Sequence, residues 1–179
     1  MSMQNLGRTA LSLGTAALAG LAIGAGICMT SQPASAQAAY GSYIGIGASG
    51  GLSSGPNGES SSAGAVIAVR YRLLEAPISL RAQALISDRT AFVPTVSYDI
   101  PINWDTDAYI GAGVALQSGD AESSSPLGDQ TSFVIQPGID YSFPDTNLVL
   151  FGNAIIAFDA YRDSNQSATS IQGGLGVRF

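Results

Sequence analysis

The residues of this 179-residue chain that could do chemistry inside a folded core are the charged ones in apolar, alternating segments. They comprise four arginines and two aspartates: Arg70, Arg72, Arg81, Asp99, Asp140 and Arg178. Guanidinium and carboxylate groups make ion pairs and charge-assisted hydrogen bonds, and away from water they persist only when paired. These residue types therefore predict a polar network.

The composition excludes the catalytic and metal sites that depend on imidazole or on several thiols. The sequence has no His and a single Cys, Cys28. A histidine-based zinc site, a Ser-His-Asp triad, a Cys-His pair and an intrachain disulfide are therefore impossible. No pair of carboxylates stands out as a general acid and its base. We expect a protein that is not an enzyme and that carries no cofactor and no metal.

The charge balance narrows the class of partner. Seven basic residues, all Arg, face 13 acidic ones, which gives a net charge of −6. A basic footprint for nucleic acid is absent. Only 11% of residues are charged and 46% are hydrophobic, whereas a soluble domain has about 25% charged residues. The chain is apolar enough for a membrane, yet it has no long apolar stretch after its first 30 residues.

Residues 1–36 are predicted to be a secretory signal peptide, which leaves residues 37–179 as the mature domain. Arg8 is the only charge in the leader, and an uncharged run follows from Ala10 to Met29. The small residues Ala34-Ser35-Ala36 then supply a cleavage site, which we place after Ala36.

Two other interpretations of the leader stay open. The run is long enough for a retained transmembrane anchor. Lipidation at Cys28 is disfavoured, because Ile27 precedes it where that processing site requires a small residue.

Period-two alternation recurs through the mature domain, and no segment has a convincing helical pattern. The domain is therefore predicted to be all-β. Eight strands are expected, at 40–50, 63–73, 78–87, 91–100, 107–117, 131–143, 147–159 and 168–179.

The connections between these strands alternate in length, which is typical of an up-and-down meander with short turns at one end. The long connections are 51–62, 118–130 and 160–167, whereas the short ones are 74–77, 101–106 and 144–146. The exception is the short connection 88–90, which falls on the long side.

Alternation alone does not separate a soluble sandwich from a membrane barrel, but the aromatic residues do favour the barrel. They are expected at strand ends, in two belts that suit the two membrane interfaces. One belt comprises Tyr71, Tyr98, Trp104, Tyr141, Phe143 and Phe179, and the other comprises Phe92, Phe133 and Phe158. The seventh strand is ambiguous, because Phe151 and Ile155 share a face with Asn153.

The end of the sequence resembles the C-terminal signal of bacterial outer-membrane barrels. In that signal a terminal aromatic residue follows apolar residues at alternate positions, here Ile171, Leu175, Val177 and Phe179. The Gly-rich segment 43–50 also resembles the first strand of small porin-family and opacity-type barrels.

This resemblance implies an eight-stranded antiparallel up-and-down transmembrane β-barrel of the OmpA/OmpX type, in the cell outer membrane of a Gram-negative cell. It also implies contact with outer-membrane lipid and lipopolysaccharide, insertion by the barrel-assembly machinery, and a monomer.

Inside such a barrel the turns predict which charged residues are neighbours. Pairing strands two and three around residues 74–77 sets Arg70 across from Arg81, and pairing strands three and four around residue 90 sets Arg81 across from Asp99. Asp140 is expected nearby. The interior of an eight-stranded barrel is just wide enough for side chains, so this row is expected to plug it, in a protein with a structural or surface-interaction role.

Three alternatives to that role remain. The row could form the constriction of a narrow porin-like channel, or the chain could be a soluble periplasmic barrel that binds a small apolar ligand. Asp120, Glu122 and Asp129 could gather a divalent cation in a long loop, although solvated acidic loops are far commoner. The sequence identifies no partner for the loops.

Overall fold

The computed structural model describes residues 41–53, 63–87, 89–118, 126–161 and 166–179. The chain divides into two compact units, 1–37 and 38–179, and the described residues all belong to the second. The expected signal peptide, Cys28, Asp120 and Glu122 lie outside the described residues. No helix in the described part of the chain is long and apolar enough to cross a membrane.

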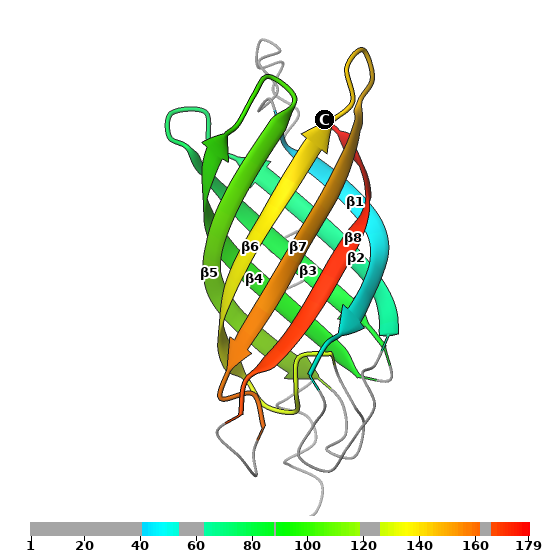
Figure 1. Cartoon of the computed structure of the whole chain (residues 1–179), viewed down its shortest axis with the longest axis vertical. Coiled ribbons are helices and arrows are strands. Elements are labelled where there is room, and N and C mark those ends of the chain that lie inside the picture. The colour runs from blue at the N-terminus through cyan, green and yellow to red at the C-terminus, as the bar shows by residue number, and fades with distance from the viewer. Residues whose placement is uncertain (1–40, 54–62, 88, 119–125, 162–165) are drawn as a thin grey trace, which may run out of the picture. The chain divides into compact units, whose positions relative to one another are not determined.

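Eight antiparallel strands close into a barrel, in which each strand pairs with the next along the chain and β8 pairs with β1 (Figure 1). The predicted all-β, eight-stranded up-and-down architecture is confirmed. The strands are β1 Tyr43–Gly51, β2 Ala63–Arg72, β3 Ile78–Ile86, β4 Thr90–Pro101, β5 Thr106–Ser118, β6 Ser132–Ser142, β7 Leu148–Phe158 and β8 Ala168–Arg178.

The strands are strongly tilted, as their register shows. The row of paired residues that leaves β1 at Tyr43 passes through Arg70, Arg81, Thr95, Gly113, Val134, Ala157 and Ala168. The register of β8 on β1 pairs Ser170 with Gly51, so Ala168 lies at the level of Ser53, ten residues beyond Tyr43. A shear of ten over eight strands corresponds to a tilt of about 40°, within the usual range for barrels.

The two ends of the barrel differ. The connections 73–77, 102–105 and 143–147 lie at one end together with Phe179, and we call this the turn end, which is uppermost in Figure 1. β1 and β2, β3 and β4, β5 and β6, and β7 and β8 meet their connections at the opposite end, the loop end. At the turn end Asp145 takes a left-handed backbone (φ 58°), which Asp tolerates better than most residues.

The outer wall of the barrel is apolar. Outward positions of every strand carry exposed aliphatic side chains, such as Ile46 at 70% exposure. Aromatic side chains are exposed near both ends, namely Tyr71, Tyr98, Trp104, Tyr141 and Phe179 at the turn end and Phe92, Phe133 and Phe158 at the loop end. An apolar band between two aromatic belts is what lipid requires of a barrel.

Large aromatic side chains fill the interior where glycines on neighbouring strands leave room. The rings of Tyr43 and Phe151 stack with centroids 5.8 Å apart. A Cβ built on Gly45 or Gly174 would lie 2.8 or 2.7 Å from the Phe151 ring, and one on Gly176 would lie 2.9 Å from the Tyr43 ring. This complementarity resolves the ambiguity of the seventh strand, since Phe151, Asn153 and Ile155 all point inward.

The interior also changes character along its length. All seven charged residues of the strands lie in the halves nearer the turn end: Arg70, Arg72, Arg81, Asp99, Asp107, Asp140 and Arg178. The buried side chains of the loop-end halves are mainly aliphatic, among them Val66, Leu85, Ala91, Val93, Ala115, Val134, Ala157 and Ala168. The turn-end half of the interior is therefore charged, whereas the loop-end half is mainly aliphatic and the one buried charge described at that end is Arg89, in the β3–β4 connection.

Candidate functional site: an ionic network inside the barrel

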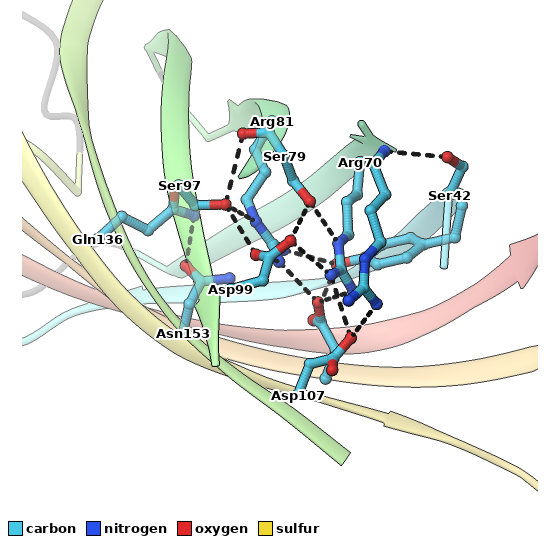
Figure 2. A network of polar contacts seen from close by, with 12 residues as sticks. Ser42, Arg70, Ser79, Arg81, Ser97, Asp99, Asp107, Gln136 and Asn153 are labelled. Carbon is cyan, nitrogen blue, oxygen red and sulfur yellow. Dashed lines mark hydrogen bonds and ion pairs between the residues drawn. The ribbon is translucent and has the colours of Figure 1, made fainter. Parts of the chain in front are cut away.

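Charged and hydroxyl side chains from β2 to β6 meet inside the barrel near the turn end (Figure 2). β2 supplies two arginines and β3 a third, whereas β4, β5 and β6 each supply one aspartate. Each of these residues sits at an inward position of its strand, since side chains alternate between the two faces of a sheet. The network joins five adjacent strands.

Arg70 lies at the centre of the network and is 2% exposed. Its guanidinium donates to Asp99 at 2.8 Å, to Asp140 at 3.0 Å and to Asp107 at 3.1 Å. Its Nε donates to the Ser79 hydroxyl at 3.1 Å. The planar fork of an arginine allows one side chain to serve several carboxylates at once.

Arg81 lies beside Arg70 and uses the same carboxylates. Its Nη2 is 2.9 Å from Asp140 and 3.4 Å from Asp99, and its Nε donates to the Ser97 hydroxyl at 2.9 Å. The guanidinium carbon sits 3.3 Å from the centroid of the Tyr109 ring, a cation–π contact. The two like charges can therefore be neighbours, because carboxylates and an aromatic face surround them.

Hydroxyl groups complete the coordination of the buried carboxylates. Asp140 accepts a hydrogen bond from Tyr43 at 3.0 Å, and Asp99 accepts one from Ser97 at 3.1 Å and a short one from Ser79. These bonds matter because a buried carboxylate needs partners for its remaining lone pairs as well as a counter-charge.

The network is electrically balanced. Arg72, which is less buried, donates to Asp107 at 3.0 Å, so that three arginines face three aspartates. Farther toward the loop end the contacts become uncharged: Thr95 donates to Gln136 at 2.7 Å, and Gln136 donates to Asn153 at 3.2 Å. The contact that crosses the interior is that of Arg70 on β2 with Asp140 on β6, since these strands lie four apart in the barrel.

The placement of the predicted site residues differs from expectation at the β3–β4 pairing. Arg70 does pair with Arg81, but the expected pairing of Arg81 with Asp99 is wrong, because Arg81 lies opposite Thr95. The β3–β4 pairing is centred on residue 88 rather than residue 90, which moves the partner by four residues. The Arg81 side chain then extends past Ser97 toward the turn end and reaches Asp99 from there.

Arg178 lies at the rim of the turn end, where its guanidinium donates to the Thr146 carbonyl. Sequence reasoning missed Asp107, although the signal was present. Asp107 shares the mixed face of its strand with Tyr109, but as one of the first residues of that strand it resembles a turn residue.

The chemistry open to this site is electrostatic. Its members are guanidinium, carboxylate, hydroxyl and phenol groups that are bonded to one another. No group of three or more potential metal ligands occurs among the residues that the structure describes. The arrangement therefore favours a plug of paired charges.

Comparison with known proteins identifies structures that share this fold. No protein-family profile matches the chain, and no curated protein sequence matches it. Among solved structures, neisserial surface protein A is similar with a TM-score of 0.55, at 16% identity over 77% of this chain and 97% of that one. The fold is that of a small transmembrane β-barrel.

Two further structures agree with this assignment. Ail, the attachment invasion locus protein of Yersinia pestis, has a TM-score of 0.54 at 17% identity, over 77% of this chain and 97% of Ail. A de novo designed transmembrane β-barrel has a TM-score of 0.53 at 11% identity, over 78% of this chain and 96% of the design. Ail has also been solved in complex with the heparin analogue sucrose octasulfate. At these identities the comparisons establish the fold.

Proposed function

We propose that this chain is an integral outer-membrane β-barrel with a structural or surface-interaction role and no catalytic activity. The observation that carries the proposal is the combination of an apolar outer wall with a neutral, fully bonded ionic network inside. A soluble barrel would expose a polar outer face, whereas this barrel exposes an apolar wall and encloses its charged strand residues.

The network supports a closed lumen rather than a channel. Arg70 and Arg81 contact side chains from several walls of the barrel at hydrogen-bonding distance, and an interior of eight strands leaves little further space. A conducting pore would need charged groups that face water and that ions can both enter and leave.

The orientation and the partners are part of the proposal. Residues 1–36 act as a cleavable signal peptide, the turn end faces the periplasm and the loop end faces outward, in contact with lipopolysaccharide and outer-membrane lipid. The connections at the loop end carry seven acidic residues and two arginines by sequence. This excess of negative charge would repel a polyanion, so we do not expect the chain to bind the heparin analogue that has been solved in complex with Ail.

Membrane fractionation and electrophysiology test the proposal. We expect the protein to be extracted only with detergent and to migrate in a heat-modifiable way on gels, and we expect both the parent and Arg81→Ala to be silent in planar bilayers. Release by osmotic shock without detergent would contradict the membrane assignment. Stepwise conductance that Arg81→Ala alters would instead support the narrow channel.

The C-terminal residues Ile171, Leu175, Val177 and Phe179 are proposed to act as the signal for the barrel-assembly machinery. Their side chains all point outward, away from the network. We expect Phe179→Ala to lower the amount of folded barrel in the outer-membrane fraction. Phe143→Ala changes an aromatic residue at the same end and should leave that amount nearly unchanged. Equal levels for the two variants would contradict the assembly role.

A further inference from the structure

A short segment of the β5–β6 connection, residues 126–130, lies against the connection that follows β7. The backbone amides of Asp129 and Gln130 both donate to the carbonyl of Ala160, at 2.9 and 3.3 Å. The side-chain amide of Gln130 donates to the carbonyls of Asp159 and Tyr161, at 2.5 and 3.3 Å. Four hydrogen bonds thus tie this segment, which we call the strap, to the rim next to β7.

The strap is also bonded to the rim at β5. The side-chain amide of Gln117, near the end of β5, donates to the Leu127 carbonyl at 3.3 Å. Since β6 lies between β5 and β7 in the sheet, these bonds hold the strap at two separate points of the loop-end rim.

Leu127 carries the one large apolar side chain of the strap, and it is 0% exposed. It belongs to the same buried cluster as the aliphatic residues that line the loop-end half of the interior, among them Val66, Leu85, Val93 and Val134. Leu127 therefore packs on the apolar cluster of the interior from the loop-end rim, and its complete burial removes its apolar surface from water.

Glycine is required at the next position. Gly128 has a φ of +87°, and a Cβ there would lie 2.8 Å from the Ala160 carbonyl carbon and 2.9 Å from its Cβ. A side chain at residue 128 would strain the backbone and push the strap away from Ala160. The position of the strap therefore depends on Gly128, a residue that lies in a connection and belongs to no strand.

We propose that the strap is a lid and that Leu127 is its stopper, so that the barrel has a second closure at its loop end, independent of the ionic network at its turn end. This inference goes beyond the proposed function, which needs only the network. A solute that approaches from the loop end has to displace Leu127 before it reaches the charged compartment.

Thiol accessibility tests the lid, and the chain suits this method because Cys28 is its only cysteine. In a Cys28→Ser background, Leu127→Cys is compared with Leu52→Cys, whose site at the same end is exposed. Both proteins are reacted with a membrane-impermeant maleimide as folded, heat-modifiable barrels in detergent micelles. We expect Leu127→Cys to react at least about tenfold more slowly, because reaction requires local opening of the strap.

A second comparison tests whether the strap is what protects the thiol. Adding Gly128→Ala to Leu127→Cys should raise the labelling rate by about tenfold, since the left-handed backbone and the contact with Ala160 both oppose a side chain. Gly50→Ala is the matched control, because a Cβ there meets no atom within 4 Å, and it should leave the rate unchanged.

Two results would overturn the proposal. Labelling of Leu127→Cys as fast as that of Leu52→Cys would show that the mouth is open. Slow labelling that neither Gly128→Ala nor Gln130→Ala accelerates would show that the strap bonds do not hold the stopper. Heat-modifiable migration of the same samples reports the barrel itself, so a failure of the lid is distinguishable from a failure of the membrane assignment.

Discussion

Replacing Asp140 by asparagine removes one charge from the ionic network and leaves the shape of the side chain almost unchanged. Asp140 accepts hydrogen bonds from Tyr43 at 3.0 Å, Arg70 at 3.0 Å and Arg81 at 2.9 Å, and its side chain is 2% exposed. In Asp140→Asn three arginines would face two aspartates, and the new NH₂ group could point its hydrogens at two guanidinium donors.

The expected cost follows from these contacts. Removing one partner of a buried ion pair destabilises a protein by about 3–5 kcal/mol, because the remaining charge is left buried. The lower end of that range applies here, since Asp99 and Asp107 still contact Arg70. With a urea dependence of about 1–3 kcal/mol per molar, a loss of about 3 kcal/mol moves the unfolding midpoint by about 1–3 M.

Urea unfolding of the barrel in detergent micelles, read from heat-modifiable gel migration, measures this shift. Glu75→Gln makes the same charge change at an exposed residue of the β2–β3 turn, and it should alter the free energy of unfolding by less than about 0.5 kcal/mol. Adding Arg81→Met to Asp140→Asn restores neutrality, so the double variant should lose about 1–3 kcal/mol less than the two single losses together. A midpoint for Asp140→Asn that matches Glu75→Gln would refute the coupled network.

Two further substitutions test the packing and the lipid-facing wall with the same assay. Gly45→Ala places a Cβ 2.8 Å from the Phe151 ring, its nearest neighbour, and should cost about 1–3 kcal/mol through overpacking. Gly152→Ala, where the nearest atom is 3.9 Å away, should be nearly neutral, and equal effects would argue against the aromatic and glycine complementarity. Ile46→Arg puts a charge on the apolar wall and should destabilise the barrel in lipid vesicles by up to about 2–4 kcal/mol. Glu75→Arg, at an exposed turn, should not, and an unaffected Ile46→Arg would contradict lipid contact on that face.

The strands themselves could be predicted from the sequence because alternation is a local property. Each expected strand overlaps an observed one, and their ends differ by three residues at most. The inward direction of Phe151 could not be predicted, because the space for its ring comes from Gly45 and Gly174 on other strands. A pattern within one strand contains no information about its neighbours.

The sequence allowed most residues of the ionic network to be predicted, but it did not allow all of their cross-strand pairings to be predicted. The alternation assigned Arg70, Arg81, Asp99 and Asp140 to one face, and the structure brings their charged groups together. The register error at the β3–β4 turn did not separate them, because the Arg81 and Asp99 side chains extend toward each other and together bridge the difference.

Leu127 illustrates the opposite case. It lies in a connection with no alternating pattern, between a proline and a glycine. Its burial depends on hydrogen bonds to Ala160 and Gln117, which are distant in sequence or on another element. A local reading of the sequence assigns such a residue to a solvated loop.

The division of the barrel interior into a charged half and an apolar half bears on how the chain enters a membrane. In an unclosed sheet, the loop-end halves of the strands carry no charged residue on either face. These halves of the strands can therefore lie in the hydrocarbon without burying an unpaired charge, whereas the loop-end connections, with seven acidic residues and two arginines, still have to cross it. The arginines and aspartates of the strands lie at the water interface, where they stay hydrated until closure of the sheet pairs them. The order of residues along each strand thus confines the cost of unpaired charge before closure to the turn-end halves of the strands and to the connections.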